Sequence, residues 1–239
     1  MILKERATAG LHQHIIEKLQ NICSAKDSQI IDVGCGSGVM LSKLAELGYT
    51  NLTGLDISPP VAIDDMIIIN FIECDLDACV TPLDDESVDL IISVEVFEHI
   101  ENIGSLLAEL SRVLAPNGVI LATTPNVHSI EARLRYLLLG KLKQFDDLGD
   151  PTHILPIFLF SFERVLRRYG LTIEASWGFP LDGSSPTSRK VLHLAAQALR
   201  LFGISGSPPG DNLCLIIRKS ESQKLSAVTS KRELLTSHY

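Results

Sequence analysis

The stretch of sequence that decides the fold is IDVGCGSG, residues 31–38, where an apolar run meets a helical pattern. Its three glycines keep side chains out of the turn, so a ligand can approach the backbone and the N-terminus of the next helix. A dinucleotide-binding fingerprint would place its third glycine at position 39, where this chain has Val39. Asp32 ends the strand with a carboxylate, which would repel a phosphate and attract a cationic amino-acid group. The stretch therefore predicts a strand, turn and helix that bind a cationic ligand.

Strand and helix patterns alternate on both sides of this turn, with period-2 or continuous apolar runs between stretches of helical spacing. We expect strands over residues 29–33, 51–55, 66–72, 88–94, 119–123, 171–177 and 213–218, and helices over 8–23, 39–47, 100–114 and 160–169. The helix between the second and third strands is expected to be short or degenerate, and Pro116-Asn117-Gly118 to form a turn. This order predicts an α/β fold with a doubly wound, mostly parallel seven-stranded sheet that binds ligands at the carboxyl ends of its strands.

The domain organisation follows from length and composition. The 239 residues are enough for one α/β domain, which we expect over residues 1–219, followed by a flexible polar tail over 220–239. A helical insertion is expected at about residues 180–210. Its apolar face between Ser188 and Phe202 could pack on the core, cover the site as a lid, form a homodimer interface or lie at a membrane surface.

Charge and cysteine usage exclude several classes of function. The net charge of −8 comes with no dense Lys/Arg stripe, so we expect no nucleic-acid partner. Five cysteines without a C-x-x-C pair indicate neither a disulfide framework nor a zinc site, and favour a reducing cytoplasm. The charged start of the chain lacks the apolar core of a signal peptide, and the apolar stretches are too short for an integral membrane segment.

A second motif, GLDIS at residues 54–58, follows the turn at the spacing of the next strand end. In these two motifs the chain resembles the class I S-adenosylmethionine-dependent methyltransferases. The resemblance implies S-adenosyl-L-methionine as cofactor, with Asp56 accepting both ribose hydroxyls and Asp75, in ECDL, lying beside the adenine amino group. The implied cofactor-binding residues are Asp32, Gly34, Cys35, Gly36, Gly38, Asp56, Ile57, Asp75, Leu76, Ser93 and Glu95.

The motif SVEVFEHI, residues 93–100, looks like the fourth-strand motif of small-molecule O-methyltransferases such as the ubiquinone-biosynthesis branch. A hydroxyl acceptor must lose a proton, and histidine titrates near neutrality, so His99 is the first candidate for a general base. Packing or capping of the next helix is the alternative role for His99. His153, in DPTHI, is the second catalytic candidate, because it could pair with His99 or hold a polar acceptor group; a structural role stays open.

A metal site is a further alternative at the same motif. Glu95, Glu98 and His99 have i, i+3, i+4 spacing, and with His153 they could bind a divalent ion if the segment is helical. Some relatives use a similar Glu-x-x-Glu-His set for a metal, but this chain has Ile100 in place of their second adjacent histidine. We therefore assign no metal site from the sequence.

The sequence as a whole predicts methyl transfer to a hydroxyl of a small molecule, either a sugar, a phenol, a quinone or a polyketide-like acceptor. N- or C-methylation stays open, as does a non-catalytic interaction module that retains the fold. A nucleotide-dependent oxidoreductase is disfavoured by the glycine spacing and by Asp32.

Overall fold

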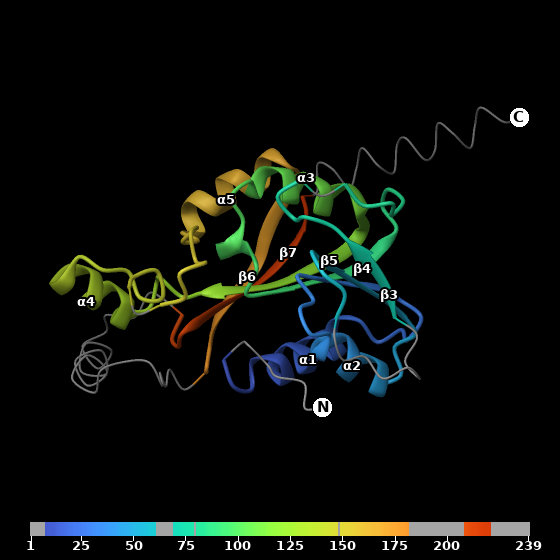
Figure 1. Cartoon of the computed structure of the whole chain (residues 1–239), viewed down its shortest axis with the longest axis horizontal. Helices are drawn as coiled ribbons and strands as arrows, with labels where there is room; N and C mark the ends of the chain where they lie inside the picture. Colours follow the sequence, from blue (N-terminus) through green and yellow to red (C-terminus); the bar gives the residue numbers. More distant parts are fainter. Residues whose placement is uncertain (1–7, 61–68, 79, 148, 182–207, 221–239) are drawn as a thin grey trace, which may run out of the picture.

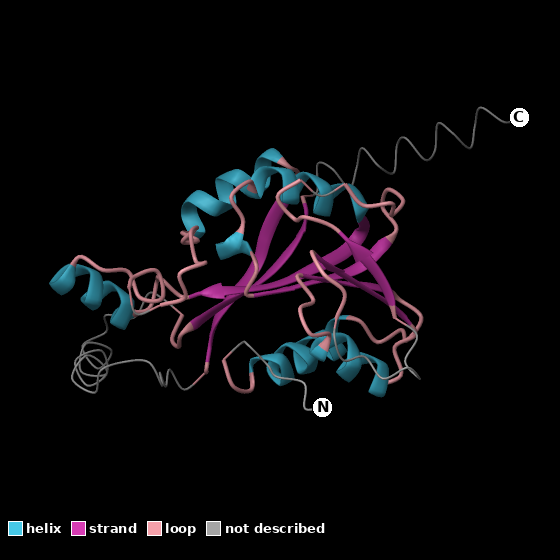
Figure 2. Ribbon diagram, in the orientation of Figure 1, coloured by secondary structure: helices cyan, strands magenta, loops and turns pink. Residues whose placement is uncertain are grey.

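A computed structural model describes residues 8–60, 69–78, 80–147, 149–181 and 208–220. They form one seven-stranded sheet of order β3-β2-β1-β4-β5-β7-β6 with helices on both faces (Figures 1 and 2). The strands are β1 Gln29–Val33, β2 Asn51–Asp56, β3 Asn70–Glu73, β4 Val88–Val94, β5 Leu114–Pro125, β6 Leu171–Phe179 and β7 Asn212–Lys219. The helices are α1 Leu11–Ile22, α2 Val39–Glu46, the short 3-10 helix η1 Phe97–His99, α3 Ile103–Val113, α4 Ile130–Leu139 and α5 Leu159–Arg168.

The sheet is parallel from β3 to β5, and β7 runs antiparallel to both β5 and β6. Its register brings the carboxyl ends of three strands together. Asp32 of β1 pairs with Gly54 of β2 and with Ile92 of β4, so the segments that follow these strands emerge at one edge. Ligands of parallel α/β sheets bind at this edge.

Apolar side chains form a core on each face of the sheet, as the two helix layers in Figure 2 indicate. One core packs α3 and α5 against the sheet, and includes Leu107 and Phe162. The other packs α1 and α2 against the opposite face, and includes Leu19 and Leu41. The central strand β4 contributes to both cores, which is why its sequence is almost continuously apolar.

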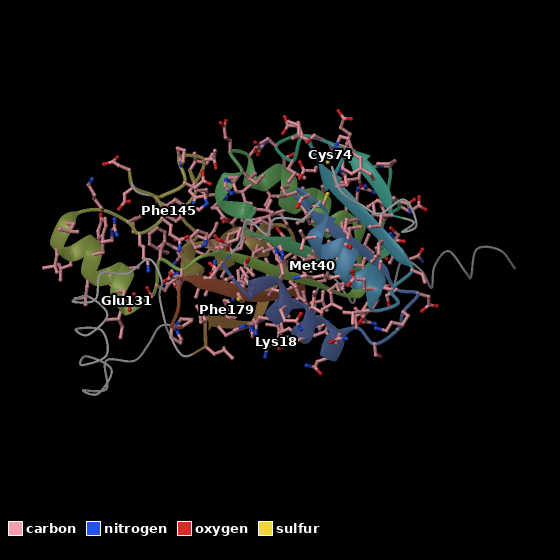
Figure 3. The ribbon with its side chains drawn as sticks, turned by 60° about the horizontal axis from the view of Figure 1, so that its bottom comes forward. Lys18, Met40, Cys74, Glu131, Phe145 and Phe179 are labelled. Carbon is pink, nitrogen blue, oxygen red and sulfur yellow. The ribbon has the colours of Figure 1, made fainter. Side chains whose placement is uncertain are left out.

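Helix α1 is fastened to β6 through one buried histidine. Trp177 Nε1 donates a hydrogen bond of 2.8 Å to His14 Nε2, and the His14 ring stacks on Phe179 with centroids 5.0 Å apart. Lys18 lies over the Trp177 ring, and Figure 3 shows Lys18 and Phe179 on the same side of the molecule. These contacts hold the start of α1, with Thr8 and His12, beside the ligand-binding edge.

The expected fold class is confirmed, and most element positions agree with the sequence patterns. The helix expected over 100–114 is instead η1 followed by α3, because the Asn102 side chain accepts a hydrogen bond from Ser105 N and caps a new helix. The turn expected at residues 116–118 lies within β5, where it forms an irregularity in the pairing with β4.

Helix α4 had no counterpart among the expected elements. It lies on an excursion beyond the end of β5, away from the two helix layers (Figure 1). The expected helix between β2 and β3, the amphipathic segment 188–202 and the tail beyond residue 220 lie outside the described residues. None of the helices within the described ranges combines the length and hydrophobicity needed to span a bilayer.

Candidate active site

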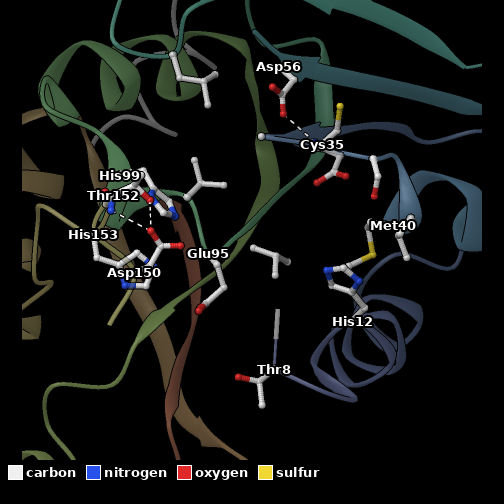
Figure 4. Close-up of a pocket in the computed structure, with 18 of the residues that line it drawn as sticks. Thr8, His12, Cys35, Met40, Asp56, Glu95, His99, Asp150, Thr152 and His153 are labelled. Carbon is white, nitrogen blue, oxygen red and sulfur yellow. Dashed lines mark hydrogen bonds between the residues drawn. The ribbon is translucent and has the colours of Figure 1, made fainter. Parts of the chain in front are cut away.

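A pocket of about 760 Å³ opens at the carboxyl edge of the parallel strands. Its walls come from the segments that follow β1, β2 and β4, from the start of α1 and from the loop around residues 144–153. Asp56 and Cys35 lie at one end, while His99, Asp150 and His153 gather at the other, with Glu95 between them (Figure 4). The volume is in the range of small-molecule and cofactor sites, which is about 300–1,000 Å³.

The glycine turn after β1 forms one wall of the pocket. Backbone N–H groups of Gly34 and Cys35 donate to Leu55 O at 2.8 and 3.1 Å, which ties the turn to β2. Gly34 has φ +69°, and a Cβ there would lie 2.7 Å from a methyl carbon of Val96. Gly36 has φ +52°, and a Cβ there would meet no atom within 4 Å, so the space beside it is open to a ligand.

Asp32 is a buried carboxyl group in this wall, with 4% of the residue exposed. Burial, and secondly the charge of Asp56, raise the pKa of Asp32 to about 8. A cation bound beside Asp32 would favour its charged form and lower that pKa. Burial also raises the pKa of the Cys35 thiol to about 12, so Cys35 is a neutral wall residue and no nucleophile.

Asp56 ends β2 with its carboxylate held by two backbone groups. Gly36 N donates to Oδ2 and Ile57 N donates to Oδ1, each at 2.8 Å. A carboxylate has about four acceptor positions, so each oxygen retains a lone pair for a ligand hydroxyl. Asp75 is exposed and its Oδ1 accepts from Asp77 N at 3.0 Å, while the next residue, Leu76, lines the pocket.

Glu95, just after β4, has a strained backbone with φ +55°. Its N–H donates to Thr123 O and Oγ1, and Thr123 Oγ1 donates to Glu95 Oε1 at 3.1 Å. Burial raises the pKa of Glu95 to about 7. Because Glu95 lies outside any helix, it does not share a helical face with Glu98 and His99, as the i, i+3, i+4 spacing would require.

The end of the pocket away from Asp56 contains two histidine rings, with centroids 4.8 Å apart. His99 Nδ1 bonds Thr152 O at 3.1 Å, and His153 Nδ1 bonds Gln144 O at 3.0 Å. A carbonyl oxygen can only accept, so each Nδ1 carries the hydrogen and each neutral ring keeps its lone pair on Nε2. Burial, and in addition the neighbouring His99, lower the pKa of His153 and keep it neutral near pH 7.

The structure brings most of the expected site residues to one pocket. Those that line it are Asp32, Gly34, Cys35, Gly36, Asp56, Leu76, Glu95, His99 and His153. Gly38, Ile57, Asp75 and Ser93 are not among the lining residues; Gly38 is the N-cap of α2, and Ser93 is fully buried. Thr8, His12, Met40 and Gln144 also line the pocket, and no local motif distinguishes them in the sequence.

The sequence of the central region matches a known family. Residues 31–122 match the family described as Methyltransferase domain. A ubiquinone biosynthesis O-methyltransferase of Colwellia psychrerythraea is 32% identical over 155 residues, which are 60% of this chain and 61% of that protein. A protein of the same name from Rickettsia bellii is 28% identical over 121 residues, which are 47% of this chain and 49% of that protein. The chain thus spans about half to three fifths of the length of these curated relatives.

Through residues 31–122 the chain is similar to the methyltransferases. Solved structures agree on the fold. A SAM-dependent methyltransferase from Archaeoglobus fulgidus has a TM-score of 0.56 at 17% identity, covering 87% of this chain and 94% of that one. The plantazolicin methyltransferase BpumL in complex with SAH has a TM-score of 0.56 at 24% identity, covering 88% of this chain and 82% of that one.

The residues of the pocket fit S-adenosylmethionine, the cofactor that the resemblance implies. The open space beside Gly36 lies next to the Asp56 carboxylate, which can accept two hydroxyl donors. Asp32 is a buried carboxyl group that a cationic amino group would stabilise in its charged form. Both features suit a nucleoside with an amino-acid tail.

Proposed function

We propose that this chain transfers a methyl group from S-adenosylmethionine to a hydroxyl of a small molecule, either a sugar, a phenol, a quinone or a polyketide-like compound. The observation that carries the proposal is one continuous pocket with carboxylates at one end and two basic imidazole nitrogens at the other. The family match supports methyl transfer, and the names of the curated relatives support an oxygen acceptor.

In this proposal the pocket residues divide into two groups. Asp56 accepts hydrogen bonds from the ribose hydroxyls, and Asp32 pairs with the amino group of the methionine moiety. Leu76 contributes an apolar wall. Glu95, between the two ends, is held by Thr123 and is poised to accept or donate a proton near neutrality.

At the end of the pocket that contains the two histidines, the substrate hydroxyl gives its proton to His99 Nε2. The oxygen of that hydroxyl is then the nucleophile. His153 lies beside His99 and orients the same group. When bound, the cofactor supplies an activated methyl group on a sulfonium. The chain itself supplies alignment of the hydroxyl with that methyl and a walled pocket that limits water, which are the main requirements of a displacement of this kind.

Two variants test the two ends of the pocket separately. Asp56→Ala should weaken binding of S-adenosylhomocysteine by roughly 10- to 100-fold, because hydrogen bonds to a charged group are worth about 1.5–3 kcal/mol. His99→Ala should leave that affinity unchanged and lower turnover of an accepted substrate. Calorimetric titration measures the first, and methyl transfer to a panel of hydroxylated small molecules measures the second. The control is Asp84→Ala, since Asp84 is exposed and does not line the pocket.

Two results would count against the proposal. If the parent protein binds no S-adenosylhomocysteine, a non-catalytic module that retains the fold becomes the better interpretation. If Asp84→Ala weakens binding as much as Asp56→Ala, the effect of Asp56→Ala does not come from lost hydrogen bonds to the ligand. A cytoplasmic location, a single domain over residues 1–219 and a homodimer remain predictions from the sequence.

A further inference from the structure

The end of the pocket that contains His99 and His153, which we call the histidine end, offers hydrogen-bond acceptor atoms to a bound substrate. The ring hydrogens are already bound within the protein. His99 Nδ1 donates to Thr152 O at 3.1 Å. His153 Nδ1 donates to Gln144 O at 3.0 Å. A neutral imidazole with its hydrogen on Nδ1 keeps a lone pair on Nε2, so each ring presents an acceptor atom to the pocket.

The neighbouring polar side chains also direct their hydrogens into the protein. Thr152 Oγ1 has one hydrogen and donates it to Asp150 Oδ1 at 2.5 Å. Gln144 Nε2 donates one of its two hydrogens to Asp211 O at 3.4 Å. The hydrogen bonds from the Thr152 hydroxyl and N–H lower the pKa of Asp150, so its carboxyl group is charged near neutral pH and can only accept. The side chains described at the histidine end therefore offer more hydrogen-bond acceptors than donors.

The pocket wall carries negative charge, and within the described part of the chain no lysine or arginine lines it. Its five carboxyl groups belong to Asp32, Asp56, Glu95, Asp150 and Asp211. Lys143 Nζ lies 2.6 Å from Asp211 Oδ1 and compensates that group from outside the pocket lining. Asp150 is exposed and charged at the histidine end. A phosphate or carboxylate on the substrate would therefore meet a like charge without a counter-ion.

These properties distinguish among sugars, phenols, quinones and polyketide-like compounds. A quinone or polyketide carbonyl oxygen can only accept, so it would leave His153 Nε2 and the Asp150 carboxylate unpaired. A catechol donates two hydrogens from one edge, but presents an apolar ring to the polar Gln144 and Thr152 side chains. The described lining residues include no phenylalanine, tyrosine or tryptophan on which that ring could stack. A saturated ring with several hydroxyl groups can donate a hydrogen from each of them.

We propose that the substrate is an uncharged compound with neighbouring hydroxyl groups on a saturated ring, as in a pyranoside; this inference rests on the proposed function. One hydroxyl donates to His99 Nε2, and its neighbours donate to His153 Nε2 and to the Asp150 carboxylate. The oxygen of the first hydroxyl forms a bond to the methyl carbon as the bond from that carbon to sulfur breaks, which leaves a neutral thioether. The proton of that hydroxyl goes to His99 Nε2.

The first test compares substrates on the full chain with S-adenosylmethionine. Methyl pyranosides of glucose, galactose and mannose are assayed beside catechol and hydroquinone, by the initial rate at which S-adenosylhomocysteine forms. We expect kcat/KM for at least one pyranoside to exceed that for both phenols by about 100-fold or more, because a site that binds several hydroxyls rejects compounds that leave its polar groups unpaired.

The second test probes charge with the uronic acid that matches the accepted pyranoside, in which a carboxylate replaces the hydroxymethyl group. Its KM should be higher by at least about 10-fold. Asp150→Asn removes the negative charge, while the amide oxygen can still accept from Thr152. The KM ratio of uronic acid to pyranoside should therefore fall by about 10-fold in this variant. The matched control is Asp84→Asn, which changes an exposed carboxyl group outside the pocket lining and should keep the parental ratio.

Titration of the parent and of both variants with S-adenosylhomocysteine separates the possible failures. If the parent does not bind it, the proposed function itself is wrong. If the parent binds it and methylates catechol or hydroquinone faster than every pyranoside, or methylates none of the pyranosides, the substrate class is wrong while methyl transfer is retained. A uronic acid that reacts with the same KM as its pyranoside would also overturn the inference.

Discussion

At the scale of single residues, the pocket contains carboxyl groups whose burial works against the stability of the free protein. Asp32 and Glu95 have pKa values raised to about 8 and about 7, mainly by burial. Each carboxyl group therefore keeps its proton to a higher pH in the folded chain than in the unfolded chain. Its contribution to the free energy of unfolding falls as the pH rises from about 4, the ordinary pKa of a carboxyl group, to the raised pKa. Ligand sites often combine such a cost with a gain when the partner binds.

The substitution Asp32→Asn tests this balance. The folded protein holds the Asp32 proton up to about pH 8, whereas the unfolded chain releases it near pH 4, so stability attributable to this group falls as the pH rises between these values. Asparagine has no ionisable proton in this pH range, so the variant lacks this pH-dependent loss of stability. The melting temperature of the ligand-free variant should therefore exceed that of the parent by a margin that grows from pH 5 to pH 8.

With S-adenosylhomocysteine present, the order should reverse, because Asn cannot pair with the amino group as a charge. Thermal unfolding at four pH values, with and without ligand, measures both effects. A melting-temperature difference that stays constant with pH would show that Asp32 is already ionised in the free protein.

At the scale of elements, α4 and the loop after it depend on a buried ion cluster for their attachment to the sheet. Lys143 Nζ lies 2.6 Å from Asp211 Oδ1, next to β7, and 3.7 Å from Glu131 Oε2 on α4. Figure 3 places Glu131 on this helix, beside the loop that contains Phe145. The same loop supplies Gln144 to the pocket, so the cluster connects the α4 excursion to the site.

Lys143→Met should destabilise the protein by about 3–5 kcal/mol, because it removes one charge from a buried ion cluster. The matched control is Lys141→Met, since Lys141 pairs with the exposed Asp147 and exposed pairs contribute about 0–1 kcal/mol. Urea unfolding compares the two variants with the parent. Equal effects of the two substitutions would mean that the Lys143 cluster is not buried in solution.

At the scale of the whole molecule, stability comes from the two cores on opposite faces of one sheet. Leu107 of α3 is fully buried in the first core, whereas Leu137 of α4 is 78% exposed. Leu107→Ala should cost about 2–5 kcal/mol through lost burial and a cavity, and Leu137→Ala should change stability by less than about 0.5 kcal/mol. The midpoint of urea unfolding measures both, and a large effect of Leu137→Ala would reveal a contact that covers α4 in solution.

The sequence alone determined the fold class and the order of elements. Local patterns suffice for this, because the glycine turn, the apolar β4 run and helical spacing each specify an element independently of the rest of the chain. The start of α3 and the existence of α4 could not be predicted from these patterns. A cap at Asn102 and the placement of α4 beyond the sheet involve contacts that periodicity does not record.

The tertiary structure alone decided which polar groups meet. In the sequence, Glu95, Glu98 and His99 look like one helical face, but the positive φ of Glu95 turns it towards Thr123 and away from that face. His153 reaches His99 only because Ile154 and Leu155 pair with Glu98 O across a long sequence separation. Local propensity determines elements, whereas the approach of two loops depends on hydrogen bonds between distant backbone groups, which the linear pattern does not encode.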